Sequence, residues 1–582
     1  MPHISVEQNS IIVDDCYDQR KTVSDIGGYW DPIEKVWKVT FTLYNLRFLL
    51  NNMDDLSVSE DLEAQVEKRR EKENQLDRLH KMSKQDVPIR FRVPGLNVSP
   101  YNYQRYGIMF TTLNGYGVLL ADEMGLGKTL QAIATAITLK DKGLAKNALI
   151  VTPASLKFNW PIEIDKFTDE KYVVIDGSPE ERIAQWLRDD VFFYVVNYEL
   201  ILEDLFGGRN FEPKPKDSAA TKARKAKQKA KADRRAKILS PVRRRMWDFI
   251  AIDEAQAIKN HSSKRTRNVK RLRSSFRMAL TGTPVDGRLE ELHSIMDWVA
   301  PGLLGSKTRF FQRHVETDFW GKVTGYKRMG EISERIQPFY IRRLKREVLQ
   351  DLPDKIYQNR IVVLSPAEKK LYDSLAEGGH EATEDSEAVV ALIRCKQFCN
   401  YPQMVDENCK KTSKLDALRE VLEEVVVMNS NKAILFSQYK EMLNVLVEIL
   451  DELGIQYLRI DGDTPKKERA EMQAMFRDDD TIDMMVGTDA MSTGLNLQAA
   501  TYVINYDDFW SPSIMAQRED RAHRIGQKET VTVVNFICKD TIEERIRSVL
   551  YNKSKITSQV LGDNTEDAVL KRLGPQDMAK LL

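Results

Sequence analysis

A glycine-rich turn that ends in Lys128 and Thr129 is the segment of this sequence best suited to bind phosphate. It follows the apolar run 117–120, and its other members are Asp122, Gly125, Leu126 and Gly127. Glycines let backbone N–H groups close around phosphate oxygens, the lysine supplies a positive charge, and a threonine hydroxyl at this place is a ligand for Mg²⁺. Residues 130–140 are predicted to form a helix whose positive N-terminal end faces the anion. Asp122 stands where the strict pattern has its first glycine, so a glycine turn without a ligand is the alternative.

An acidic pair follows a second short apolar run. Residues 249–252 are typical of a strand, and Asp253 and Glu254 come directly after it. Phosphoryl transfer requires a carboxylate that holds Mg²⁺, directly or through water, and a group that polarises the attacking water. We assign the first role to Asp253 and the second to Glu254. On its own such a pair is usually the N-cap and first turn of a helix, but Lys128 and Thr129 upstream favour the catalytic interpretation.

Two arginines, Arg521 and Arg524, lie in a segment that begins at Gln517. Three residues apart on a predicted helix, they share one face. In a protein that hydrolyses nucleotides they are candidate arginine fingers, which stabilise charge on a transferring phosphoryl group from the opposite lobe. We include Gln517 with them among the candidate catalytic residues. The alternative is a surface patch of ion pairs with Glu519 and Asp520.

The order of these three elements resembles that of the Swi/Snf-type ATPases of helicase superfamily two. Segments that match motifs of this family occur, in chain order, at Tyr103–Gln104, 151–156, 197–200, 253–256, 280–284, 434–439 and 487–497. The last of them departs from the family's pattern, because Met491–Gly494 stands where a pair of glycines is usual.

The resemblance implies ATP and Mg²⁺ as cofactors and movement along double-stranded DNA, usually without strand separation. It makes Gln104 the reader of the adenine base. Hydroxyl and amide side chains in four of the motifs suit the DNA backbone, which carries no base information. The candidate DNA-binding residues are Thr152, Thr283, Ser437 and Asn496.

Apolar strands that alternate with helical stretches predict an α/β fold with two RecA-like parallel-sheet lobes, helical protrusions and a small N-terminal accessory domain. In the accessory part, Trp37, Val39 and Phe41 alternate along one side of a predicted strand. This part resembles, more weakly, the domain that precedes the motor in the annealing-helicase (HepA-related) branch and recognises branched or forked DNA. The predicted divisions are 1–98 (accessory), 99–301 (lobe 1, with a basic insertion at 205–246), 302–411 (protrusions and linker, without strand alternation), 412–561 (lobe 2) and 562–582 (tail).

The insertion concentrates positive charge. The chain has 88 Lys or Arg and 87 Asp or Glu, yet residues 214–245 hold fourteen Lys or Arg against two Asp. Because the segment is rich in Ala, Lys and Arg without apolar periodicity, we expect disorder in the unbound protein and a helix on a polyanion. The functional interpretation is an arm that grips phosphates and is sensitive to salt. The alternatives are a solvated loop or, in a eukaryote, a nuclear-import signal.

Length and composition limit the class of protein. A chain of 582 residues is too long for one core. No apolar run approaches the ~20 residues that span a bilayer, so we expect no membrane partner. Five cysteines, an odd number, fit a reducing compartment better than a disulfide framework. The pair Cys395 and Cys399 lacks the further ligands of a zinc site.

The leading hypothesis is an ATP-driven double-stranded DNA translocase that remodels forked or branched DNA or protein–DNA complexes. Two alternatives stay open: an ATPase that recycles RNA polymerase, and a nucleic-acid clamp that uses ATP as a switch with incidental turnover. We expect a monomer that works with a replication, repair or transcription protein. It would be cytoplasmic and nucleoid-associated in a bacterium or virus, and nuclear in a eukaryote.

Overall fold

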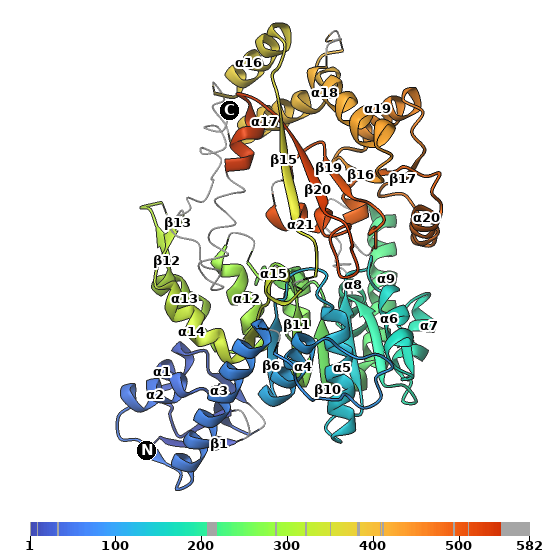
Figure 1. The fold of residues 1–582 in the computed structure, drawn as a ribbon. Helices are drawn as coiled ribbons and strands as arrows, with labels where there is room; N and C mark the ends of the chain where they lie inside the picture. The colour runs from blue at the N-terminus through green and yellow to red at the C-terminus, as the bar shows by residue number, and fades with distance from the viewer. Residues whose placement is uncertain are drawn as a thin grey trace. The chain divides into compact units, whose positions relative to one another are not determined.

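The chain forms two compact units. The computed structural model describes residues 2–548 except 8–9, 32–33, 86, 207–217, 286–287, 321–322, 350, 381–384, 408, 410–411, 493–494 and 510. One unit comprises Met1–Val315 and Lys327–Val348, and the other comprises Glu316–Tyr326 and Leu349–Leu582 (Figure 1). The predicted tail 562–582 lies outside the described residues.

The first unit begins with a small five-stranded sheet. Its strand order is β3 (Tyr29–Asp31), β4 (Val36–Thr40), β2 (Ser10–Asp14), β1 (His3–Glu7) and β5 (Ser57–Val58). Helices α1 (Arg20–Asp25) and α2 (Leu43–Asn52) accompany it. Val39 and Phe41 are buried in the core of this domain and Trp37 packs against it, so the predicted aromatic face is mainly a packing surface.

Close backbone contact joins this small domain to the rest of the first unit. Gly27 and Gly302 both have positive φ, +80° and +78°, and a Cβ on Gly27 would lie 2.1 Å from the Cα of Gly302. No side chain fits between two backbones at that distance, and glycine alone adopts this φ without strain. Arg309 adds an ion pair to Asp25 at 3.1 Å. The accessory domain is therefore docked rather than tethered.

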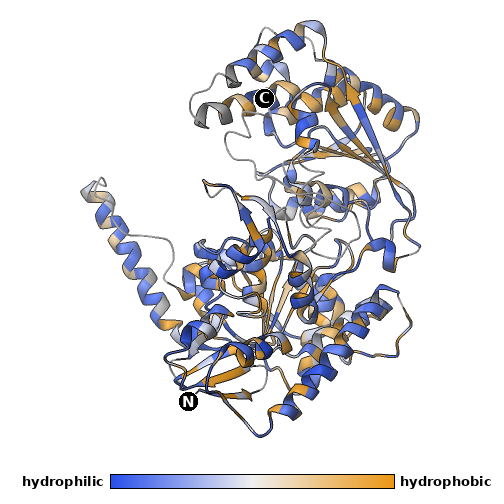
Figure 2. Ribbon diagram, turned by 90° about the vertical axis from the view of Figure 1, so that its left-hand side faces the viewer, coloured by the Kyte–Doolittle hydropathy of each residue, from blue (hydrophilic) through white to orange (hydrophobic). Residues whose placement is uncertain are grey.

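A seven-stranded sheet forms the first lobe. Its order is β14 (Tyr340–Ile341), β6 (Gly117–Leu120), β11 (Arg273–Leu280), β10 (Met246–Ile252), β7 (Ala148–Thr152), β9 (Phe193–Asn197) and β8 (Tyr172–Val174), all parallel. Its central strands are apolar and buried, as expected for a parallel sheet covered on both faces (Figure 2). Helices of this lobe include α4 (Asn102–Asn114), α5 (Lys128–Asp141), α6 (Asn159–Phe167), α7 (Pro179–Trp186) and α12 (Leu289–Val299).

A six-stranded parallel sheet forms the second lobe. Its order is β15 (Lys355–Val362), β20 (Val531–Cys538), β19 (Tyr502–Asn505), β16 (Ala433–Phe436), β18 (Met484–Gly487) and β17 (Tyr457–Ile460). The surrounding helices include α16 (Pro366–His380), α17 (Asp385–Asn400), α18 (Ser413–Leu422), α19 (Lys440–Glu452), α20 (Lys466–Asp478) and α21 (Pro512–Glu519). The predicted α/β fold with two parallel-sheet lobes is confirmed.

The expectation that 302–411 lacks strands needs correction. The segment contains β12 (Val315–Thr317), β13 (Val323–Tyr326), β14 and β15, beside the helices α13 (Lys307–His314) and α14 (Met329–Ile336). β14 has only two residues, which are too few to show the apolar pattern of a strand. β15 is an edge strand whose side chains are mostly exposed, so it shows no alternation of apolar and polar residues. β14 belongs to the sheet of the first lobe, and β15 belongs to the sheet of the second lobe.

The basic insertion also differs from expectation. Residues 219–238 form the helix α9 (Ala219–Ile238), with the Ser218 side chain accepting a hydrogen bond from the Thr221 N–H at its N-cap. Alanine, lysine and arginine have high helix propensity, and the capped first turn adds to it. The first part of the insertion, 207–217, lies outside the described residues.

All five cysteines are buried free thiols. Within the described part of the chain, no helix is both long and apolar enough to cross a membrane.

A half-buried histidine in the first unit predicts loss of stability in acid. His80 lies on α3 (Leu62–Lys84) against Phe110 and Tyr340, and burial lowers its pKa to about 4. The unfolded chain binds this proton near pH 6.5, so the free energy of unfolding falls as the pH drops from 6.5 towards 4. We expect a loss of about 2 kcal/mol, allowing for partial exposure of the ring.

Thermal unfolding across this pH range measures the effect. His80→Phe, which keeps the ring contacts, should flatten the dependence of the melting temperature on pH. An equally steep dependence in the variant would assign the acid sensitivity to other groups.

Candidate nucleotide-binding site

The predicted phosphate loop lies between β6 and α5. Gly125 and Gly127 have φ of +84° and +72°, and a Cβ on Gly127 would lie 2.5 Å from Nε2 of Gln104. Both positions therefore require glycine. Lys128 begins α5, and its Nζ donates hydrogen bonds to the carbonyl oxygens of Asp122 and Glu123 at 2.8 and 3.3 Å. Thr129 follows in the first turn of a 14-residue helix, where free N–H groups favour an anion.

Asp122 plays a different part from the predicted one. Its carboxylate is fully buried and accepts hydrogen bonds from Nε and the backbone N–H of Arg343, at 2.8 and 3.1 Å, and from Nε2 of Gln131 at 2.9 Å. Arg343, also fully buried, completes the ion pair through Nη2 and donates to Oε1 of Gln131 at 2.7 Å. The carboxylate is thus neutralised inside the protein, so Asp122 shapes the loop and its side chain does not face a nucleotide.

Gln104, the predicted reader of adenine, is buried against the same loop. Its Oε1 accepts a hydrogen bond from the Tyr101 N–H at 3.0 Å, and its Nε2 donates to the carbonyl of Leu126 at 3.1 Å and to the Tyr103 hydroxyl at 3.3 Å. Both ends of the amide are engaged within the protein. A contact with adenine would require an exchange of these bonds.

Asp253 and Glu254 follow the carboxyl end of β10, at the same edge of the sheet as the loop after β6. Oδ2 of Asp253 accepts from Nε1 of Trp160 at 3.0 Å and from the Thr152 hydroxyl at 3.3 Å. Burial, together with the charge of Glu254, raises the pKa of Asp253 to about 6, and the charge of Lys128 opposes this rise. A half-buried carboxylate beside a second carboxylate is stabilised by a cation. The oxygen donors of Asp253 and Thr129 are the type that Mg²⁺ prefers, so these residues fit the ion.

Glu254 occupies a strained backbone position. Its φ and ψ are +48° and +59°, a left-handed conformation that is unfavourable for a residue with a long side chain. Its Oε2 accepts from Nε2 of Gln256 at 2.7 Å, and Oε1 of Gln256 accepts from the Thr281 hydroxyl at 2.9 Å. The Thr283 N–H then donates to that hydroxyl at 3.0 Å. A continuous hydrogen-bond chain therefore connects the acidic pair to the loop after β11.

The four candidate DNA-binding residues are placed differently from one another. Thr152 is buried, and its hydroxyl supports Asp253. Ser437 is buried, and its hydroxyl donates to Oδ2 of Asp507 at 2.6 Å. Both hydroxyls are engaged in hydrogen bonds within their lobe, so a contact with a DNA backbone would require an exchange of these bonds, and the two assignments stay predictions. Thr283 is half-buried, and only Asn496 is exposed.

The two predicted arginine fingers do not share a helical face. α21 ends at Glu519, and beyond it the carbonyl of Arg521 accepts a hydrogen bond from the Leu497 N–H at 3.0 Å. The guanidiniums nevertheless meet: Nη1 of Arg521 and Nη1 of Arg524 both donate to the carbonyl of Leu495, at 3.0 and 3.4 Å.

The neighbours of these arginines have other partners. Glu519 and Asp520 pair with Lys355 of β15 at 2.9 and 3.3 Å, which argues against the alternative of a surface patch of ion pairs. Gln517 is mostly buried, and its backbone carbonyl accepts a hydrogen bond from Nε of Arg521 at 3.2 Å.

Two buried arginines that support the candidate site residues and their segments were not found by reasoning from sequence. Arg343 is one. The other is Arg518, which is fully buried between Asp489, 2.7 Å from its Nε, and the carbonyl of Asp507, 2.8 Å from its Nη1. In both cases the partners are remote in sequence, so no local spacing reveals them.

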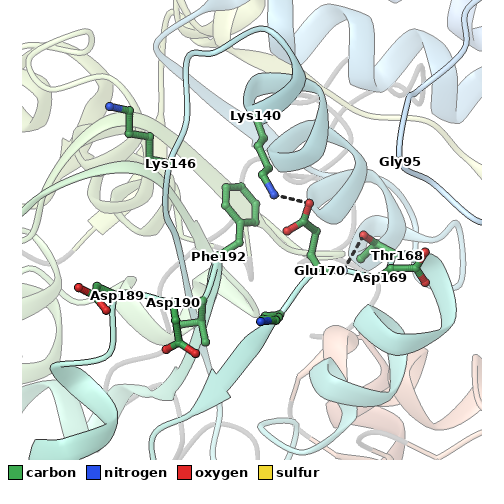
Figure 3. Close-up of a pocket in the computed structure, with 11 residues that line it drawn as sticks. Gly95, Lys140, Lys146, Thr168, Asp169, Glu170, Asp189, Asp190 and Phe192 are labelled. Carbon is green, nitrogen blue, oxygen red and sulfur yellow. Dashed lines mark hydrogen bonds and ion pairs between the residues drawn. The ribbon is translucent and has the colours of Figure 1, made fainter.

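A separate hollow of about 500 Å³ lies in the first lobe. Its lining includes Lys140, near the end of α5, and Lys146 and Phe192, which precede β7 and β9, so it borders the amino ends of these strands. Figure 3 shows Lys140 directed at Glu170, with 2.5 Å between Nζ and Oε1. This hollow is therefore distinct from the phosphate loop, which lies at the carboxyl edge of the sheet.

Comparisons with known proteins agree with this arrangement. The model of the SNF2-related domain matches residues 47–414, and that of the helicase conserved C-terminal domain matches residues 413–526. A putative ATP-dependent helicase/translocase of Bacillus subtilis is 32% identical over 79% of this chain and 48% of its own length. An uncharacterized ATP-dependent helicase of Mycoplasma pneumoniae is 31% identical over 79% of this chain and 42% of its own length.

The chain spans less than half the length of these two curated relatives. A solved SWI2/SNF2 ATPase core of Sulfolobus solfataricus in complex with dsDNA is 28% identical, covering 81% of this chain and 95% of its own, with a TM-score of 0.38. The SNF2-related domain alone accounts for more than half of the sequence, and the chain therefore belongs to the SNF2-related family of helicase-type ATPases.

Proposed function

We propose that this protein hydrolyses ATP to move along double-stranded DNA, and that it remodels forked or branched DNA or protein–DNA complexes. The observation that carries the proposal is the arrangement at the carboxyl edge of the first sheet. There the phosphate loop, the acidic pair and the Glu254–Gln256–Thr281 hydrogen-bond chain come together, in a chain of the SNF2-related family.

Each residue at this edge has a chemical role in the proposal. Lys128 and the first N–H groups of α5 bind the phosphates of ATP. Mg²⁺, held by Thr129 and Asp253, would neutralise charge on the phosphate oxygens. Glu254 orients and polarises the attacking water, and its strained backbone holds the carboxylate in place. Arg521 and Arg524 form a paired positive group within the second lobe, which suits them to stabilise phosphoryl charge.

The hydrogen-bond chain that begins at Glu254 supports a link between hydrolysis and movement. A change in the hydrogen bond between Glu254 and Gln256 reaches Thr281 and Thr283 through two further hydrogen bonds. Thr283 and the exposed Asn496 are two of the four candidates for contacts with the DNA backbone. The choice of forked or branched DNA rests on the weaker resemblance of the accessory domain to the annealing-helicase branch.

ATP turnover measured with duplex, single-stranded, forked and RNA substrates at one salt concentration tests the proposal. We expect duplex and fork to stimulate turnover at least tenfold, and single strands and RNA to do so much less. A triplex-displacement assay should show removal of a third strand without separation of the duplex.

Two results would contradict the proposal. Equal turnover with and without duplex DNA would exclude a DNA-driven motor. ATP-dependent DNA binding without displacement of the third strand, unchanged in Glu254→Gln, would instead identify an ATP-switched clamp.

A further inference from the structure

We infer that α9 is a preformed arm that binds the phosphate backbone of nucleic acid through residues outside the motor motifs. The inference deepens the proposed function, since it names a second surface for the same ligand. It concerns the residues of α9 and the cluster that anchors them, all within the first unit.

The charge of α9 is unlike that of the other long helix in this unit. α9 carries nine Lys or Arg and one Asp in 20 residues, whereas α3 carries seven Lys or Arg and five Asp or Glu in 23. The basic residues of α9 lie on all sides of the helix, and those at 222, 224, 227, 229, 231, 234 and 237 are exposed. An excess of one sign on an exposed helix is the electrostatic footprint of a polyanion-binding surface.

This charge is unfavourable for the free helix. Lys227 and Lys231, which are exposed and four residues apart, face each other along the helix and repel. Among the side chains of α9 that the structure describes, none forms a buried apolar face that would offset the repulsion. Phosphates placed along the helix would offset this repulsion between lysines, so binding to a nucleic-acid backbone stabilises the helix.

A buried carboxylate anchors the C-terminal end of the arm. Nη1 of Arg235 donates to Oδ1 of Asp204 at 2.8 Å and to Oε1 of Glu203 at 3.0 Å. Asp204, which is fully buried, also accepts from Nε of Arg182 at 3.0 Å and from Nε1 of Trp186 at 3.1 Å. Arg235 is thereby withdrawn from ligand binding and fixes the helix to the lobe, so the arm is oriented before any ligand arrives (Figure 1).

Geometry and composition favour nucleic acid as the ligand. Twenty helical residues span about 30 Å, and duplex DNA presents one phosphate about every 1.7 Å along its axis. The nine Lys and Arg of α9 are spaced by about 3.3 Å of helix length on average, which is close to the roughly 3.4 Å between phosphates along one strand of the duplex. The absence of an apolar face along the described α9 argues against a membrane surface, which an amphipathic helix requires.

The test replaces four exposed lysines, Lys222, Lys227, Lys229 and Lys231, with glutamine, whose helix propensity is similar. The matched control replaces Lys68, Arg70, Arg78 and Lys81 of α3 with glutamine, removing the same charge from four exposed positions of another helix. Binding of a fluorescent 30-base-pair DNA duplex is measured by anisotropy in the full-length protein, without ATP, from 50 to 300 mM salt.

We expect the α9 variant to bind the duplex about 10-fold to 100-fold more weakly at 100 mM salt. The slope of log Kd against log salt should fall by about 2 to 3 units. The control should change Kd less than threefold, and ATP turnover without DNA should be the same in all three proteins.

Two outcomes would overturn the inference. One is an equal loss in both variants, which would show a net-charge effect. The other is unchanged duplex binding by the α9 variant with loss of binding to polyglutamate, which would assign the arm to an acidic protein. Failure of the proposed function is distinguishable, because it would appear as unstimulated ATP turnover in the unaltered protein, whatever the binding data show.

Discussion

Replacing Glu254 with glutamine should lower ATP turnover by about three orders of magnitude and leave ATP binding almost unchanged. Glutamine has the size of glutamate, and its Oε1 can still accept the hydrogen bond from Gln256 at this strained position. It has no negative charge with which to polarise water. Turnover by a phosphate-release assay and affinity by a fluorescent ATP analogue separate the two effects.

The same substitution elsewhere in the lobe provides the control. Glu170→Gln alters a carboxylate that pairs with Lys140 at the amino edge of the sheet, and it should leave turnover within twofold of the original. Lys128→Ala, by contrast, should reduce both binding and turnover. Normal turnover in Glu254→Gln would show that another group activates the water.

The largest effect on stability is expected from Arg343→Met. The substitution leaves the Asp122 carboxylate buried without its cation, and breaking a buried pair in this way costs about 3–5 kcal/mol. Because Asp122 precedes the phosphate loop, we also expect nucleotide affinity to fall by at least tenfold. Chemical denaturation and ATP-analogue binding measure the two consequences.

A double-mutant cycle distinguishes loss of the pair from loss of packing. Asp122→Asn combined with Arg343→Met should recover part of the stability, because no unpaired charge then remains buried. Arg342→Met removes the neighbouring guanidinium and leaves the pair intact, so it should cost less. A double variant no more stable than Arg343→Met alone would mean that the arginine acts through packing only.

The fold followed from local patterns. The apolar run at 117–120 matches β6, and the strand predicted before Asp253 lies within β10. Buried parallel strands are continuous apolar runs, and the functional segments follow their carboxyl ends, so both can be located from sequence. Edge strand β15 and the two-residue β14 lack such runs, and for that reason the region 302–411 was misjudged.

Residues of the candidate site could be predicted from sequence only where they stand close together in a short motif. Lys128 and Glu254 stand in short motifs. Arg343 meets Asp122 across 221 residues, a separation that no spacing rule covers. The sequence of a motif also does not indicate where its hydroxyl side chains point: the Ser437 hydroxyl donates a hydrogen bond to Asp507 inside the lobe. Only the folded chain decides which way such a side chain points.

The contact between Gly27 and Gly302 affects how the accessory domain can be dissected. Cutting the chain after its first hundred residues would uncover Arg335, which is now covered by the ring of Tyr44, 4.0 Å away, and would confuse a lost DNA contact with a damaged surface. The substitution Gly27→Ala instead places a single methyl group at the contact between Gly27 and Gly302. It forces the two backbones apart while every other residue stays present, and because φ of +80° also strains an alanine at this position, the stability of the accessory domain must be measured beside its contribution to activity.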